Sequence, residues 1–177
     1  MIIESDVLFA HIKENDWLKK SADALIEAID DGTVGTVYAS RESLHELCHL
    51  ASKLGWKPAE ALVKIGSLTR IRNLEWPPTT TDVDLLALSL LATYDLSSIF
   101  DSSHAATRLL FDPEHTIVST DEVYDKIKSL SRLEPRRAIE KKSSKEPAAF
   151  LERWYRNCVI RSNGILGRQY KLEIYSM

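Results

Sequence analysis

Four acidic side chains lie in separated segments of this sequence, at positions where their carboxylates could bind a common metal ion. Glu4 directly follows a short apolar run, and Asp121 closely follows a β-branched one. Asp101 begins an apolar helical segment, and Glu46 lies within another. Carboxylates that gather in one place repel each other unless a cation neutralises them, and oxygen ligands suit Mg²⁺ or Mn²⁺. A pair of such ions can activate water for attack on a phosphodiester.

Each of these acids also has a simpler structural explanation when it is taken alone. Asp101 opens a helix, where the macrodipole favours an acid, and Asp121 is able to cap one. Glu46 fits the solvated face of a helix. Oxygen-ligand sites leave no sharp sequence signature, so spacing alone favours these structural roles over a metal site.

Parallel strands that alternate with helices would bring the acids together. Apolar, β-branched runs predict strands at approximately 1–4, 34–38, 71–74 and 116–118. Helical periodicity predicts helices at approximately 5–12, 16–31, 40–53, 58–68, 81–91, 102–110 and 122–130. This alternation is typical of a three-layer α/β/α domain with a mostly parallel central sheet. In such folds ligand sites lie beyond the carboxyl ends of the strands.

The composition predicts a soluble protein of the cytoplasm. Of the 177 residues, 44% are hydrophobic and 28% are charged, an ordinary globular balance. The sequence shows no targeting segment and no apolar run long enough to span a bilayer. We expect Cys48 and Cys158 to be reduced thiols on helix faces, Cys48 on a buried one, with a long-range disulfide as the less favoured alternative. The helix at 81–91 is apolar nearly all round, which predicts a central, buried position.

The net charge of −3 conceals a basic C-terminal part. Residues 1–135 contain 13 Lys/Arg and 22 Asp/Glu, whereas residues 136–177 contain 10 and 4. An acidic body with a basic tail is typical of a metal site beside a polyanion-binding element. Two complementary surfaces that pack on each other remain an open alternative.

The C-terminal part divides into a linker and an extension. Residues 136–147 are charged and lack periodicity, which predicts a linker. Residues 148–177 predict an amphipathic helix followed by a possible strand, with the helix presenting Leu151, Trp154, Tyr155 and Cys158 on one face. Such a helix needs a packing partner, so we expect a homodimer contact in preference to docking on its own domain.

Four short segments resemble the PIN-domain family. Residues 3–8 (Ile-Glu-Ser-Asp-Val-Leu) are similar to its opening, and residues 43–47 (Ser-Leu-His-Glu-Leu) to its second motif, a helical glutamate between leucines. Residues 100–106 (Phe-Asp-Ser-Ser-His-Ala-Ala) and residues 117–121 (Ile-Val-Ser-Thr-Asp) resemble its third and fourth motifs. All four follow the family's order, which implies a PIN-like nuclease domain over residues 1–135.

The resemblance implies a carboxylate-lined Mg²⁺ or Mn²⁺ site that cuts RNA, as in toxins of the VapC type, for which an antitoxin protein would be a partner. Carried over by position, the catalytic and metal-binding acids would be Glu4, Glu46, Asp101 and Asp121. Asp6 would help to orient water or ligand. The family's first acid is usually Asp, so Glu4 departs from the pattern by one methylene group.

Asp6, Glu42 and Asp125 are secondary candidates for the site. Glu42 lies one turn before Glu46 and is its rival as the helical ligand. Asp125 lies one turn after Asp121 and could support the site from outside the ligand set. We expect His104 to make a local hydrogen bond and not to bind metal, because Mg²⁺ and Mn²⁺ prefer oxygen ligands.

The sequence therefore predicts a metal-dependent endoribonuclease that hydrolyses phosphodiester bonds with metal-activated water. The alternative is a PIN-like domain that binds RNA or a protein without cutting, which the departure at Glu4 and the long tail favour. A phosphatase with an aspartyl nucleophile is less favoured, because Glu4 stands where that chemistry needs an aspartate.

Overall fold

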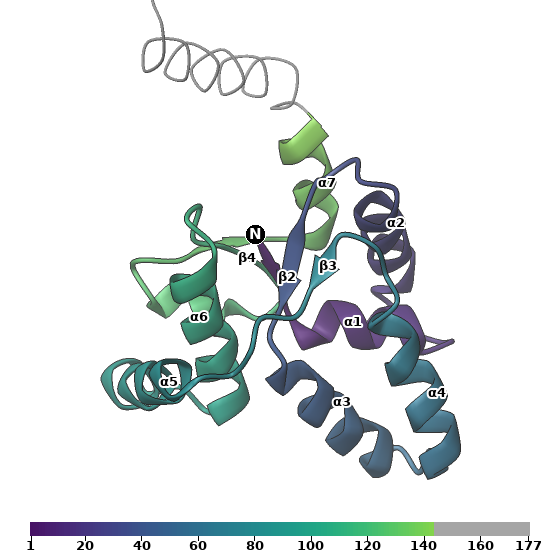
Figure 1. Cartoon of the computed structure of the whole chain (residues 1–177), viewed down its shortest axis with the longest axis horizontal. Helices are drawn as coiled ribbons and strands as arrows, with labels where there is room; N and C mark the ends of the chain where they lie inside the picture. The colour runs from purple at the N-terminus through teal and green to yellow at the C-terminus, as the bar shows by residue number, and fades with distance from the viewer. Residues whose placement is uncertain (144–177) are drawn as a thin grey trace, which may run out of the picture. The chain divides into compact units, whose positions relative to one another are not determined.

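The computed structural model describes residues 1–143, which form a five-stranded, wholly parallel sheet with helices on both faces (Figure 1). The strand order is β3-β2-β1-β4-β5. The strands are β1 (Ile2–Ile3), β2 (Val37–Ala39), β3 (Leu74–Glu75), β4 (Thr116–Val118) and β5 (Ser131–Leu133). The helices are α1 (Ser5–Ile12), α2 (Lys19–Asp30), α3 (Glu42–Lys53), α4 (Pro58–Leu68), α5 (Thr81–Tyr94), α6 (Ile99–Phe111), the 3₁₀ helix η1 (Glu122–Lys126) and α7 (Pro135–Ser143). The predicted amphipathic helix and strand of residues 148–177 lie outside the described residues.

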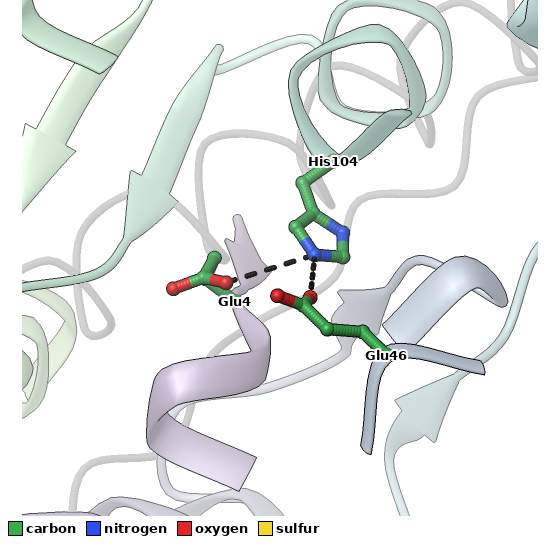
Figure 2. Close-up of side chains that lie close together, drawn as sticks. All are labelled: Glu4, Glu46 and His104. Atoms are coloured by element: carbon green, nitrogen blue, oxygen red, sulfur yellow. Dashed lines mark hydrogen bonds and ion pairs between the residues drawn. The ribbon is translucent and has the colours of Figure 1, made fainter. Parts of the chain in front are cut away.

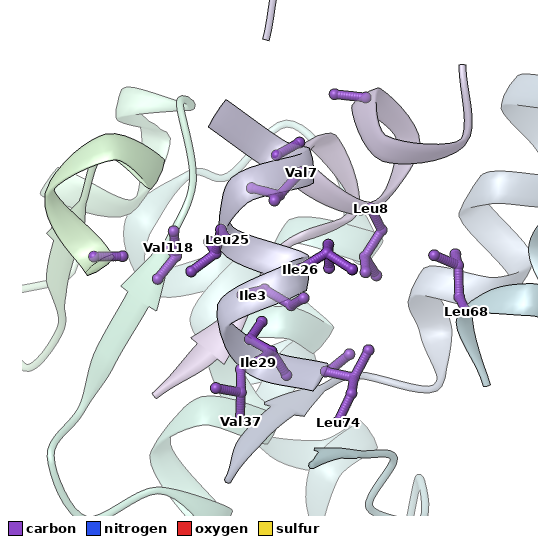
Figure 3. Packing of buried hydrophobic residues seen from close by; sticks show 14 of the residues in the cluster. Ile3, Val7, Leu8, Leu25, Ile26, Ile29, Val37, Leu68, Leu74 and Val118 are labelled. Atoms are coloured by element: carbon purple, nitrogen blue, oxygen red, sulfur yellow. The ribbon is translucent and has the colours of Figure 1, made fainter. Parts of the chain in front are cut away.

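Neighbouring residues of the central strands face two separate hydrophobic cores. Ile3 and Val118 pack with the buried faces of α1, α2 and α4 (Figure 3). Ile2 and Ile117 pack with α5, α6 and the segment that follows β4. Because side chains alternate across a strand, the two cores lie on opposite faces of the sheet. The predicted three-layer α/β/α fold is confirmed.

The strand register aligns three loops at the carboxyl edge of the sheet. Ile3 of β1 pairs with Ala39 of β2 on one side and with Val118 of β4 on the other. The backbone N–H of Glu4 continues this ladder by donating to the carbonyl of Val118 at 3.1 Å. The residues that follow β1, β2 and β4 are therefore neighbours in space, which is where parallel sheets place ligand sites.

Two predictions of burial are wrong. Helix α5 buries only the stripe Val83, Ala87 and Leu90, and Leu85 is 62% exposed. The apolar residues around the whole helix suggested a central position. Only one side of the helix packs against the core, and apolar side chains on its other side are exposed. Cys48 is an exposed free thiol, because it lies off the stripe through which α3 packs.

The segment after β4 also differs from its prediction. A single helix was expected at 122–130, but the chain forms η1 and then the edge strand β5. Strands β2 and β3 begin three residues later in the chain than expected. A short apolar run predicts that a strand is present better than it predicts where the strand begins and ends. The ends depend on hydrogen bonds with neighbouring strands.

The first part of the predicted linker is helical. Helix α7 buries Ala138 in the same core as α2, and Arg136 Nε donates to Ser21 Oγ at 3.1 Å. The many charged residues of this segment made its helical pattern hard to recognise in the sequence. Its apolar face consists of only Ala138 and Ile139, which pack against the core. The prediction of a linker from residue 136 is therefore wrong for residues 136–143.

None of the helices in residues 1–143 is by itself long and apolar enough to cross a membrane. The pair α5 and α6 passes that test together, by length and composition only, with a bend of 117° between them.

Replacement of Ala138 tests whether α7 belongs to the folded domain. Ala138 is 1% exposed, so Ala138→Gln places a longer polar side chain in a filled core. We expect the free energy of unfolding to fall by about 2 kcal/mol. Urea denaturation measures this, with Arg137→Gln on the exposed side of α7 as the control, expected within about 0.5 kcal/mol of the parent. Equal stability of both variants would contradict the packing of α7.

Candidate functional site

Glu4 links the end of β1 to the start of α1. It is the N-cap of α1, and its Oε2 accepts from the backbone N–H of Asp6 at 3.3 Å. Ser119, which follows β4, donates its hydroxyl to the same Oε2 at 3.2 Å. Glu4 is only 5% exposed, so its carboxylate is fixed inside the carboxyl edge of the sheet.

Glu46 and His104 approach Glu4 from two different helices (Figure 2). The His104 imidazole, on α6, lies with its Nε2 3.0 Å from Oε2 of Glu46, on α3. The same nitrogen lies 3.6 Å from Oε1 of Glu4. One ligand atom from each of these three residues lies within 4.8 Å of the others. Three segments far apart in the sequence therefore meet around one small volume.

The Ser5 hydroxyl lies between the two glutamates. Its Oγ is within hydrogen-bond distance of Oε1 of Glu4 and 2.5 Å from Oε2 of Glu46. A hydroxyl has one proton to donate, so it cannot satisfy two ionised carboxylates at once. A proton or a cation shared among these groups would satisfy both carboxylates.

The pKa values of the two glutamates move in opposite directions. Burial raises the pKa of Glu4 well above its ordinary value, and the negative charges of Asp6 and Glu46 add to that effect. Burial also acts to raise the pKa of Glu46, but the hydrogen bond and charge of His104 outweigh it and lower the pKa. The protonated form is thus favoured on Glu4 and the ionised form on Glu46.

Asp101 lies in the first turn of α6 and is 8% exposed. Its pKa is raised to about 6, chiefly by burial; the charges of Asp121 and Glu46 add to this rise, and His104 opposes it. Asp101 therefore lies close enough to Asp121 and Glu46 to interact with both charges. Ser97 Oγ, at 3.5 Å from Oδ2, is its nearest side-chain donor.

Asp121 and Asp6 are connected through the loop after β4. Asp121 is exposed and caps η1, and its backbone N–H donates to Ser119 Oγ at 2.8 Å. Asp6 Oδ2 accepts from the backbone N–H and the hydroxyl of Thr120 at 2.7 and 2.6 Å. Asp6 thus anchors the loop that carries Asp121.

Glu42 and Asp125, two of the secondary candidates, are engaged elsewhere. Glu42 accepts from Thr79 at 3.2 Å and lies 2.9 Å from His45 Nδ1. Asp125 forms a two-pronged ion pair with Arg132 at 3.0 and 2.9 Å. Among the described residues, these contacts tie both acids to partners outside the Glu4 and Glu46 cluster.

The sequence did not predict the positions of two residues in this region, His104 and Tyr124. His104 was expected to make a local hydrogen bond, but its contact is to Glu46 on another helix. Tyr124 is fully buried, and within residues 1–143 its hydroxyl has no hydrogen-bond partner. Burial raises its pKa, and the charges of Glu4 and Asp101 add to the effect, so it borders the acids. The local sequence around Tyr124 carries no signal of this position.

The donor set suits a hard divalent cation. Glu4 and Glu46 present carboxylate oxygens, which Mg²⁺ and Mn²⁺ prefer. Burial, and after it the charges of neighbouring acids, raise the pKa values of Glu4 and Asp101, so ionising these carboxylates is costly. A cation would offset their negative charge, so these residues fit the metal that the sequence predicts.

Comparison with solved structures identifies a similar fold. A chain of the crystal structure of VapBC2 from Rickettsia felis, bound to a DNA fragment from their promoter, matches with a TM-score of 0.54 and 16% identity. The match covers 75% of this chain and 96% of that chain. At this identity the similarity shows the fold alone. No curated protein matches in sequence.

Comparison with protein families is more direct. Residues 1–130 match the PIN domain, and this segment contains all four of the predicted site acids. It also spans β1 to η1, the part of the chain that forms the carboxyl edge described above. A match over this share of the sequence shows that the chain belongs to the PIN domain family.

Proposed function

We propose that this protein is an Mg²⁺- or Mn²⁺-dependent endoribonuclease of the VapC type. PIN domains are generally nucleases, so family membership supports a hydrolase. The observation that carries the proposal is the meeting of Glu4 and Glu46 within one buried cluster at the carboxyl edge of the sheet. Asp101 and Asp121 complete the proposed metal-binding and catalytic set.

Each residue has a definable part in this reaction. When bound, a divalent cation lowers the pKa of a water and stabilises charge on a phosphodiester. Glu4 and Glu46 would hold it directly, with Asp101 and Asp121 binding directly or through water. His104 keeps Glu46 ionised and oriented, since its imidazole lies 3.0 Å from that carboxylate. Asp6 fixes the loop that presents Asp121.

The glutamate at position 4 is compatible with this role. Its carboxylate is held by Ser119 and by the backbone N–H of Asp6, which fold the longer side chain back against its own helix. The extra methylene therefore does not let the carboxylate leave the cluster. Its distance of 3.6 Å from His104 Nε2 keeps it beside Glu46.

We further propose an antitoxin as a protein partner, in the cytoplasm where the RNA substrate would be met. The similar fold comes from a complex named VapBC2, which supports a protein partner for this chain as well. Helix α4 presents Leu62 and Val63 with 74% and 72% exposure, an apolar surface suited to such a contact. A homodimer, formed through residues 148–177, remains our expectation for the free protein.

One observation favours the non-catalytic alternative. The carboxylates of Glu4 and Glu46 already have Ser5, Ser119 and His104 within hydrogen-bond distance, so the cluster is partly satisfied by the protein itself. A PIN domain that binds RNA or a protein without cutting would need no more than this. Metal-dependent cleavage separates the two functions.

Asp101→Asn should abolish RNA cleavage in Mn²⁺ while stabilising the metal-free protein. Burial raises the pKa of Asp101 to about 6 from 3.8, so its ionised form costs folding free energy. This cost is absent below the unfolded pKa and complete above the folded one. The stability advantage of the variant should therefore grow from pH 4 to pH 7, to about 2 kcal/mol. Denaturation at several pH values and cleavage of a mixed RNA pool measure both effects.

The control for this variant is Glu75→Gln, which changes an exposed acid outside the cluster and should alter neither property. A lower stability of metal-free Asp101→Asn at pH 7 would show a capping role for Asp101. Undiminished cleavage by Asp101→Asn would remove this acid from the proposed catalytic set.

Metal binding should depend on Glu46 and not on Glu42, its neighbour one turn away on α3. Glu46 contacts the cluster of Glu4 and His104, whereas Glu42 contacts Thr79 and His45. We expect Glu46→Gln to weaken Mn²⁺ binding on the order of tenfold or more. Glu42→Gln should leave it unchanged. Calorimetric titration of the full chain decides this, and the reverse ranking would make Glu42 the helical ligand.

A further inference from the structure

A cavity lies at the carboxyl ends of β2 and β3. Its volume is about 560 Å³, and its lining includes Arg41, Glu42, His45, Trp76 and Thr79. Arg41 and Glu42 follow β2, and Trp76 directly follows β3. The cavity is therefore on the same edge of the parallel sheet as the proposed catalytic acids.

Helix α3 connects this cavity to the catalytic acids. Glu42 and Glu46 are four residues apart on it, so they share a face and are separated by about 6 Å along the helix axis. Glu46 contacts the catalytic cluster, and Glu42 lines the cavity. A strand of RNA positioned for cutting at Glu46 would have its neighbouring nucleotide at the mouth of this cavity.

The side chains of the cavity offer three kinds of contact. The carboxylate of Glu42 is held in place by Thr79 and His45, yet the side chain remains 23% exposed. Trp76 contributes an aromatic wall. Arg41 is exposed, and among the described residues its guanidinium forms no hydrogen bond or ion pair. An oriented acceptor, an aromatic surface and a free cation are the elements that recognise a nucleotide.

We propose that this cavity binds a guanine base of the RNA, next to the phosphodiester that is cut; the proposal rests on the ribonuclease function proposed above. An ionised carboxylate only accepts hydrogen bonds. Guanine offers it two adjacent donors, the ring N1–H and the exocyclic amino group, which match the two carboxylate oxygens. Adenine and cytosine place an acceptor nitrogen beside their amino group, and uracil flanks its single N–H with two carbonyls.

Arg41 supplies the contact that does not depend on the base. A guanidinium pairs with phosphate oxygens through two parallel N–H donors. Its position directly before Glu42 places it at the mouth of the same cavity. It therefore binds the phosphate of whichever nucleotide enters, while Glu42 selects the base.

Binding of mononucleotides to the full-length protein tests the proposal without any need for cleavage. Calorimetric titration with GMP, AMP, CMP and UMP should show GMP bound about tenfold more tightly than the others. Glu42→Gln should remove this preference, because an amide presents a donor where guanine also presents one. Arg41→Ala should weaken all four nucleotides by a similar factor. Glu75→Gln, an exposed acid on the neighbouring strand β3, is the matched control and should bind as the parent does.

Equal affinities for the four mononucleotides, or a guanine preference that survives Glu42→Gln, would overturn the proposal. Cleavage of a random-sequence RNA in Mn²⁺ separates it from the proposed function. Guanine enriched beside the cut, and lost in Glu42→Gln, supports both. Cutting without base preference leaves the nuclease and removes the guanine site. Glu42-dependent binding of GMP by a protein that cuts no RNA leaves the guanine site and removes the nuclease.

Discussion

Buried negative charge is the constraint on which this structure depends. Glu4 and Asp101 lie in the interior edge of the domain, where ionisation is costly, and Glu46 lies beside them. Hydrogen-bond partners from segments that are distant in sequence partly offset this cost. Ser119, after β4, contacts Glu4, and His104, on α6, contacts Glu46. The remaining charge is what would make a divalent cation bind tightly, because a cation removes the repulsion that the donors leave.

The parallel sheet makes this arrangement possible. Strand β1 lies between β2 and β4, and all three strands are parallel. The loops that follow these strands therefore lie side by side at one edge of the sheet. Glu4 comes from the first of these loops and Ser119 from the last, while α3 descends from β2 with Glu46. The two hydrophobic cores hold the helices on opposite faces, so α3 and α6 bring Glu46 and His104 together from both sides of the sheet.

The sequence predicted the fold and the family because both depend on repeated local patterns. Strand–helix alternation and four short motifs are visible without any knowledge of packing. The exposure of Cys48 and Leu85 was not visible, because apolar composition does not say which side of a helix meets a core. Nor was the contact of His104 with Glu46, since it joins residues 58 positions apart and depends on how two helices pack. The site acids themselves remain a proposal.

In the function proposed here, helix α3 carries two separate properties, base recognition at Glu42 and metal binding at Glu46. A rigid helix keeps Glu42 and Glu46 at a constant spacing, so a substitution at Glu42 would change the base that is recognised without moving Glu46. Descendants of such a protein could acquire new targets by single changes at the entrance of α3 while their chemistry stayed intact. Retargeting would then be an evolutionary path of few steps, open to laboratory selection as well.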